Sequence, residues 1–187
     1  MKNKLVLPAF VLMVAAQLYV PVQMVMHMEH VLQTGMTYKF RTTPINTHEP
    51  LYSPYLSLSF LATSVKVDTS AGWTYGEQAY VMLTTDSSGY AKIAGISREE
   101  PSDQESYVMA SIDFAPGDSS GLVYVRYPFD RYYMEGPKND PDGEHYTSFI
   151  PDSNQVAYAL VVVDKGQSVL KDVIVDGESL REIVRKN

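Results

Sequence analysis

The sequence contains no cysteine. This absence excludes disulfide bonds, catalysis by a thiolate, and zinc or iron–sulfur sites built on cysteine ligands. It leaves the compartment open, because a chain of 187 residues buries enough apolar surface to fold without covalent cross-links. With 45% hydrophobic and 20% charged residues, the composition is that of a folded protein.

Positive charge is scarce outside the first few residues. Two of the 15 basic residues, Lys2 and Lys4, lie among the first 26, which leaves 13 basic against 22 acidic side chains and a net charge of −9. This balance repels the phosphates of DNA and RNA, and no run of basic residues offsets it. The sequence therefore argues against nucleic-acid binding.

The one long hydrophobic run lies near the N-terminus, where residues 5–26 carry no charge. A helix of that length measures about 33 Å and covers a hydrocarbon core of about 30 Å. Lys2 and Lys4 precede the run, so the positive-inside rule places the N-terminus in the cytoplasm and the rest of the chain outside. We expect a single-pass membrane protein, with its anchor in residues 1–32 and an extracytoplasmic domain in residues 33–187.

Two alternatives compete with an anchor. Val14, Ala15 and Ala16 offer a cleavage site for a signal peptide, and the run is also compatible with a buried core helix. The apolar character continues well past Ala16, which the mature N-terminus of a soluble protein does not need. The sequence therefore favours an uncleaved anchor.

After Gly35, which is a plausible helix stop, the pattern changes from helical to alternating. Short β-rich runs follow, separated by turn residues, and the sequences DSSG (86–89) and DKGQ (164–167) are typical hairpin connections. The predicted strands are 36–42, 55–60, 78–85, 90–97, 106–112, 121–127, 155–163 and 168–175. Only the tail after Gly177 is predicted to be helical, so we expect a mainly β domain.

The sequence also contains an approximate repeat. Residues 79–97 align with 157–175: both begin with Ala-Tyr, have an Asp at the turn and continue with an apolar strand after it. Residues 35–46, which precede the first of these segments, resemble residues 121–130, which precede the second. This collinearity predicts a domain built from two pseudo-repeats of short antiparallel strands, at about 35–113 and 114–187.

The span from the anchor to Phe60 resembles the bacterial GDYXXLXY family. In that family a membrane helix leads into a Gly-led strand, a Pro-containing turn and the motif Gly-Asp-Tyr-x-x-Leu-x-Tyr. The matching positions here are Pro44, Asn46 and Pro50 in the turn, and Tyr55, Leu58 and Phe60 in the motif. Arg131, Tyr132 and Glu135, in RYYMEG, resemble a second family segment, and the hairpin ending in IVDG (174–177) fits as well.

The chain departs from the motif where Ser53 and Pro54 replace Gly-Asp and Tyr52 replaces a basic residue. A ligand or charge role of Gly-Asp would be absent here. The family has no established biochemical function, but its members are anchored by one helix and are often encoded beside a polytopic membrane protein. The resemblance therefore implies a protein of the bacterial inner membrane with a membrane partner, and it supplies no chemistry.

Three motifs suggest a catalytic or metal site, but each lacks a part that such a site needs. GDSSG (117–121), with Ser119 and Ser120, resembles the nucleophile segment of a serine hydrolase, but no histidine lies in the context of a catalytic base. His27 and His30 are spaced to share a metal ion, but no third ligand follows. The acidic loop 139–145 hints at weak calcium binding without the ligand spacing of an EF-hand.

Two surfaces suggest binding. Trp73 and Tyr75 are candidates for a platform that stacks a sugar, although tyrosine is equally common on ordinary strands. The turn from Pro44 to Pro50, with Tyr52 and Tyr55, is the better candidate for a protein contact. We expect a non-enzymatic accessory subunit of a polytopic membrane protein, without a cofactor, and an envelope module that binds sugar or calcium is the alternative.

Overall fold

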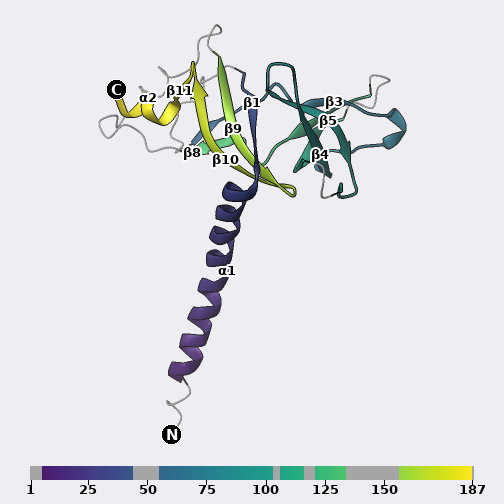
Figure 1. Cartoon of the computed structure of the whole chain (residues 1–187). Coiled ribbons are helices and arrows are strands. Elements are labelled where there is room, and N and C mark those ends of the chain that lie inside the picture. The colour runs from purple at the N-terminus through teal and green to yellow at the C-terminus, as the bar shows by residue number, and fades with distance from the viewer. Residues whose placement is uncertain (1–5, 44–54, 103–105, 116–120, 134–155, 187) are drawn as a thin grey trace.

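A computed structural model describes residues 6–43, 55–102, 106–115, 121–133 and 156–186. Helix α1 (Val6–Thr34) projects as a stalk from a β domain (Figure 1). From Leu7 onward it is long and apolar enough to cross a membrane, and its apolar window is not buried by the described part of the chain. The buried core helix is therefore the wrong alternative, because a core helix would be covered by the domain.

The stalk enters the domain without a linker. The backbone N–H of Gly35 donates to the carbonyl of Val31 at 2.9 Å, and strand β1 (Met36–Arg41) begins at the next residue. Val31 is only 1% exposed. A Cβ atom at position 35 would lie 2.6 Å from Cγ1 of Val162, so only glycine permits this close approach of helix and sheet. The predicted helix stop at Gly35 is confirmed.

The described strands form three antiparallel sheets. The four-stranded sheet has the order β1, β9 (Ala157–Asp164), β10 (Gln167–Val175) and β11 (Glu178–Ser179). The five-stranded sheet has the order β3 (Ser64–Lys66), β7 (Leu122–Arg126), β6 (Tyr107–Phe114), β4 (Gln78–Thr85) and β5 (Ala91–Ser97). A two-stranded sheet pairs β2 (Tyr55–Ser57) with β8 (Arg131–Tyr133), and the 3₁₀ turn η2 (Thr69–Ala71) and helix α2 (Leu180–Lys186) complete the described elements.

This architecture confirms the mainly β prediction, both hairpins and the helical tail. The predicted strand 55–60 is too long, because β2 ends at Ser57. The chain changes partner there: the N–H of Leu58 still donates to Asp130 beside β8, whereas the carbonyl of Ser59 accepts from Thr43 after β1. Strands β3, β8 and β11 were not predicted, since two or three residues are too few to show alternation.

The segments 35–113 and 114–187 do not form separate sheets. Strand β1 of the first segment pairs with β9 of the second, and β7 of the second pairs with β3 and β6 of the first. The two-stranded sheet also takes one strand from each segment. Their buried side chains join in one hydrophobic cluster, so the two segments share one core.

Four aromatic rings occupy the centre of this core, and they come from β1 and from the segments beside β2, β7 and β8. Their centroids lie 4.9 to 5.9 Å apart, mostly in edge-to-face contact. The rings are those of Phe40, Phe60, Tyr127 and Phe129. Burial of a side chain of this size contributes about 1.5–3 kcal/mol, and edge-to-face pairs add to it. The hydroxyl of Tyr127 donates to the carbonyl of Ala62 at 2.6 Å.

The turn between β9 and β10 joins the helix to both larger sheets. Lys165 and Gly166 both have positive φ angles, as a two-residue hairpin turn of this twist requires. The N–H of Gly166 donates to Tyr107 in β6 at 3.2 Å, and its carbonyl accepts from Met109 at 2.9 Å. The Thr34 hydroxyl shares its proton between the carbonyl of His30 at 2.9 Å and Asp164 at 3.1 Å. The end of the helix and the two sheets therefore meet at one turn.

Substitution Gly166→Ala is expected to loosen this joint. Gly89, in the β4–β5 turn, has the same φ of 80°, but a Cβ atom there would meet nothing within 4 Å, whereas at Gly166 it would lie 3.0 Å from the Tyr107 ring. Gly89→Ala is expected to cost about 1–2 kcal/mol for the left-handed backbone alone. Gly166→Ala should cost at least about 1 kcal/mol more, because the ring must move.

Chemical unfolding of the detergent-solubilised chain, followed by Trp73 fluorescence, measures the difference between the two variants. Equal losses of unfolding free energy in both would contradict the proposed contact between Gly166 and Tyr107.

Candidate functional site

The outward face of the two-stranded sheet carries an exposed aromatic and cationic cluster. Tyr55 and Tyr133 lie opposite each other across β2 and β8, with ring centroids 5.6 Å apart. The guanidinium of Arg131 lies 4.8 Å from the centre of the Tyr55 ring. Tyr133 is 60% exposed and the Arg131 side chain 55% exposed. We call these three residues, Tyr55, Arg131 and Tyr133, the β2–β8 cluster.

The inward face of the same strands holds the cluster in place. Leu56 and Tyr132 are a cross-strand pair, and both are buried. The hydroxyl of Tyr132 donates to Oδ1 of Asp172 in β10 at 2.8 Å, and the Arg181 guanidinium of α2 lies 5.2 Å from its ring. Burial raises the pKa of the Tyr132 hydroxyl, so it stays neutral and remains a donor. The strand pair is thereby attached to the four-stranded sheet.

The predicted contact residues divide into three groups. Tyr55 and Arg131 face outward together, whereas Leu58, Phe60 and Tyr132 are buried and serve the core. The third group lies outside the described residues and comprises Pro44, Asn46, Pro50, Tyr52 and Glu135.

Sequence reasoning missed Tyr133. Alternation from Arg131 places it on the same face, and this signal was available once 131–133 was known to be a strand.

The predicted alternation of exposed and buried residues is confirmed in the strand that carries Tyr55 of the motif. Tyr55 and Ser57 are more exposed than Leu56 and Leu58, which are buried. A family model described as GDYXXLXY protein matches residues 17–173, which is most of the chain. The chain belongs to the GDYXXLXY family. In this member, the leucine and the final aromatic position of the motif build the core, and the motif tyrosine reaches the surface. No curated protein and no solved structure matches the chain.

The candidate catalytic and metal motifs receive no support from the described residues. Ser119, Ser120 and the acidic loop 139–145 lie outside them. His27 and His30 lie on the exposed part of α1. Within the described ranges, no three His, Asp or Glu side chains are grouped so that they could hold a metal ion.

The candidate sugar platform is partly covered. The guanidinium of Arg98 lies 4.1 Å from the centre of the Trp73 ring. Arg98 also forms an ion pair with Glu77 and donates to the carbonyl of Ala71 at 2.9 Å. Because these contacts hold Arg98 over one face of Trp73, a sugar could stack there only after displacing it. Tyr75, in contrast, is 75% exposed.

The Glu77–Arg98 pair predicts a pH dependence of stability. The hydrogen bond from Arg98, assisted by the N–H of Thr74, lowers the pKa of Glu77 from its ordinary value of 4.5 to about 2. A carboxyl whose pKa is lower in the folded state stabilises the fold above pH 4.5, and the contribution disappears as the pH falls toward 2.

Replacement Glu77→Gln is therefore expected to flatten the decline in unfolding free energy between pH 5 and pH 2, by an amount that solvent screening keeps small. Denaturant titrations read by Trp73 fluorescence measure the profile, and Glu99→Gln, at another exposed position, is the matched control. If Glu77→Gln and Glu99→Gln change the profile equally, the ion pair does not contribute as described.

Proposed function

We propose that the chain is a single-pass accessory subunit of the bacterial cytoplasmic membrane, with its N-terminus in the cytoplasm. It works by binding: its extracytoplasmic β domain docks on a polytopic membrane protein through the β2–β8 cluster. The observation that carries this proposal is an apolar helix, uncovered by its own domain, that continues without a linker into a domain with an exposed Tyr-Arg-Tyr cluster.

The joint between helix and domain supports a docking role. Val31 is buried, Gly35 admits no side chain, and the Thr34 hydroxyl donates to Asp164. These contacts give the domain a set height and rotation relative to the helix. A partner in the same membrane meets the cluster at high effective concentration, so a modest interface is sufficient.

The composition of the cluster supports a protein partner. Tyrosine and arginine are the residue types that dominate interface energetics, because they bury a large area and retain polar groups for hydrogen bonds. Arg131 is already stacked on Tyr55, which lowers the entropy lost on binding. Asp130 lies 4.0 Å from Arg131, so the cluster does not present an isolated positive charge.

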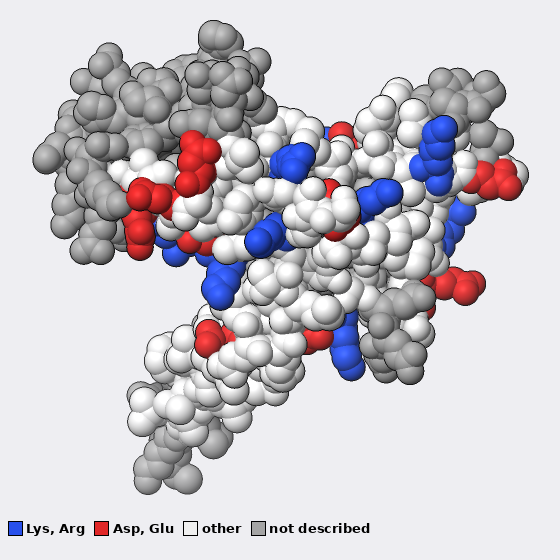
Figure 2. Space-filling model, turned by 45° about the horizontal axis from the view of Figure 1, so that its top comes forward, with Lys and Arg blue, Asp and Glu red and all other residues white. Residues whose placement is uncertain are grey.

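The helix itself supports a partner with membrane helices of its own. Residues 5–26 contain Gln17 and Gln23, and the amide of Gln23 donates to the Tyr19 hydroxyl at 2.6 Å. The carboxamide of glutamine is costly to expose to lipid, and polar side chains within a membrane helix are typical of contacts between helices. Figure 2 shows the described stalk largely free of charge, whereas charges of both signs are scattered over the domain.

The docking surface is tested by Tyr55→Ala. Affinity purification from the native host in mild detergent, with mass spectrometry, is expected to recover a polytopic membrane protein with the wild type. Tyr55→Ala should reduce that recovery at least tenfold, which corresponds to about 1.4 kcal/mol. Tyr75→Ala is the matched control, because Tyr75 is an exposed tyrosine outside the cluster and its loss should leave recovery unchanged. Failure to recover a polytopic protein with the wild type would contradict the accessory role, and equal losses in both variants would contradict the surface.

The orientation is tested by single cysteines, which the natural sequence lacks. In cells with a permeabilised outer membrane, an impermeant maleimide is expected to label Lys66→Cys, because Lys66 is exposed in the β domain. Asn3→Cys should react only after lysis. The reverse labelling would overturn the orientation, and a chain that lacks its first 16 residues and leaves the membrane fraction would show a cleaved signal peptide.

A further inference from the structure

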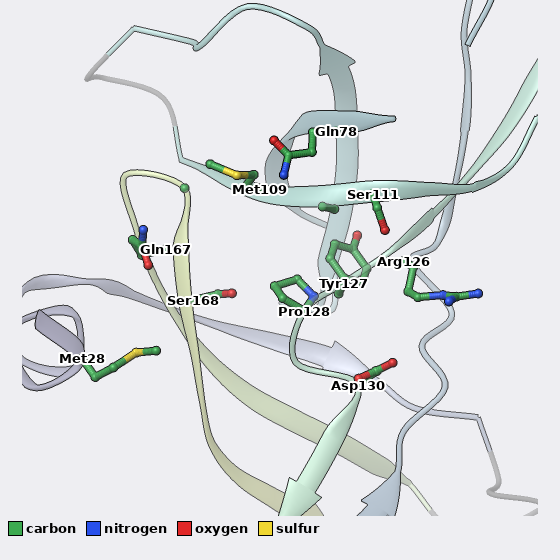
Figure 3. A pocket seen from close by; sticks show the side chains of 12 residues that line it. Met28, Gln78, Met109, Ser111, Arg126, Tyr127, Pro128, Asp130, Gln167 and Ser168 are labelled. Carbon is green, nitrogen blue, oxygen red and sulfur yellow. The ribbon is translucent and has the colours of Figure 1, made fainter. Parts of the chain in front are cut away.

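A groove lies where the stalk meets the domain. It has a volume of about 560 Å³ and is bounded by the end of α1, the β9–β10 turn, and strands β6 and β7 (Figure 3). Met28 lines it from the helix, Gln167 and Ser168 from β10, Met109 from β6 and Gln78 from β4. The residues of the β2–β8 cluster do not line this groove, so the groove is a second candidate site.

One polar atom in the groove has no partner. The hydroxyl oxygen of Ser168 is buried and makes no hydrogen bond within the described part of the chain. In Figure 3 this hydroxyl is turned away from its own strand, across the groove toward Pro128. A buried hydroxyl without a partner is uncommon, because its desolvation is not offset. Because the Ser168 side chain lines the groove, a rotation about its χ1 would present the hydroxyl to a ligand that supplies the missing hydrogen bond.

The groove lies at the depth of lipid headgroups, a conclusion that rests on the membrane anchor of the proposed function. The uncharged run ends at Met26, and Met28 is about 3 Å further along the helix. The headgroup layer extends roughly 5–7 Å beyond the hydrocarbon core on each side. The mouth of the groove at Met28 therefore falls within that layer.

The charges and polar groups that line the groove indicate which kind of lipid headgroup fits it. Arg126 and Asp130 contribute one charge of each sign; Arg126 is paired with Asp113, and Asp130 lies 4.0 Å from Arg131. Gln78 and Gln167 add neutral amides. A lining without net charge disfavours a purely anionic ligand and suits one that carries a phosphate together with an ammonium group. Hydroxyl and amide donors suit the phosphate oxygens, and an aspartate suits the ammonium.

We propose that this groove binds the headgroup of a zwitterionic phospholipid beside the stalk. Met28 and Met109 border the site with flexible apolar side chains that adapt to the glycerol and the first acyl carbons. A bound headgroup would supply the partner of Ser168 and brace the helix against the β9–β10 turn.

The test uses the full chain in nanodiscs of equal parts phosphatidylethanolamine and phosphatidylglycerol, followed by native mass spectrometry of the released protein. The wild type is expected to retain one phosphatidylethanolamine in preference to phosphatidylglycerol. Ser168→Ala, which removes the hydroxyl and adds no bulk, should lower that retention at least fivefold. Ser64→Ala makes the same change at an exposed position of β3 and should have no effect. Gln167→Ala, at an exposed lining position, should also lower retention and is the second variant if Ser168→Ala does not fold.

Each other outcome overturns a distinct claim. A chain that does not enter nanodiscs refutes the anchor, and with it the headgroup site. A chain that enters them but retains the two lipids equally, or retains phosphatidylethanolamine equally in wild type and variants, refutes the headgroup site and leaves the anchor standing. Soluble phosphoethanolamine should displace the lipid, and displacement by inorganic phosphate at the same concentration would show a simple anion site instead.

Discussion

The hydrogen bonds around the β9–β10 turn are the constraint on which the arrangement of helix and sheets depends. Asp164 binds the last residue of the helix, and Gly166 binds the backbone of β6 in the other large sheet. One short turn therefore aligns three elements that are distant in sequence. Its backbone conformation requires positive φ angles, and its closeness to Tyr107 requires the absence of a side chain at position 166.

This joint has a consequence for any function at a membrane. A domain on a flexible tether samples many orientations, whereas this domain continues from its helix through one glycine and is held by side contacts. The β2–β8 cluster and the groove beside Met28 therefore keep their positions relative to the helix axis (Figure 1). The two proposals are compatible, because they assign the protein contact and the lipid headgroup to different residues.

Long helices and strands with a clear hydrophobic periodicity were predictable from the sequence, and short strands were not. Strand β4 was predicted to the residue, and the hairpins were recognised from the turn sequences DSSG and DKGQ. The strand predicted at 55–60 was three residues too long, because local alternation continues to Phe60 although the hydrogen-bond partner changes between Leu58 and Ser59. Of the candidate contact residues, Tyr55 and Arg131 face outward, whereas Phe60 and Tyr132 are buried. Local alternation places Tyr55 and Phe60 on opposite faces, but the other strands decide which face is buried.

The sequence by itself determined the apolar helix, the mainly β domain and the family, because hydrophobic runs, period-two alternation and motif residues are local properties. It did not determine that the two similar segments share sheets, because strand pairing across more than a hundred residues leaves no local signal. Only the tertiary structure brought Arg131 onto Tyr55 and left the Ser168 hydroxyl without a partner. Both are relations between chain segments that meet only when the whole core has formed.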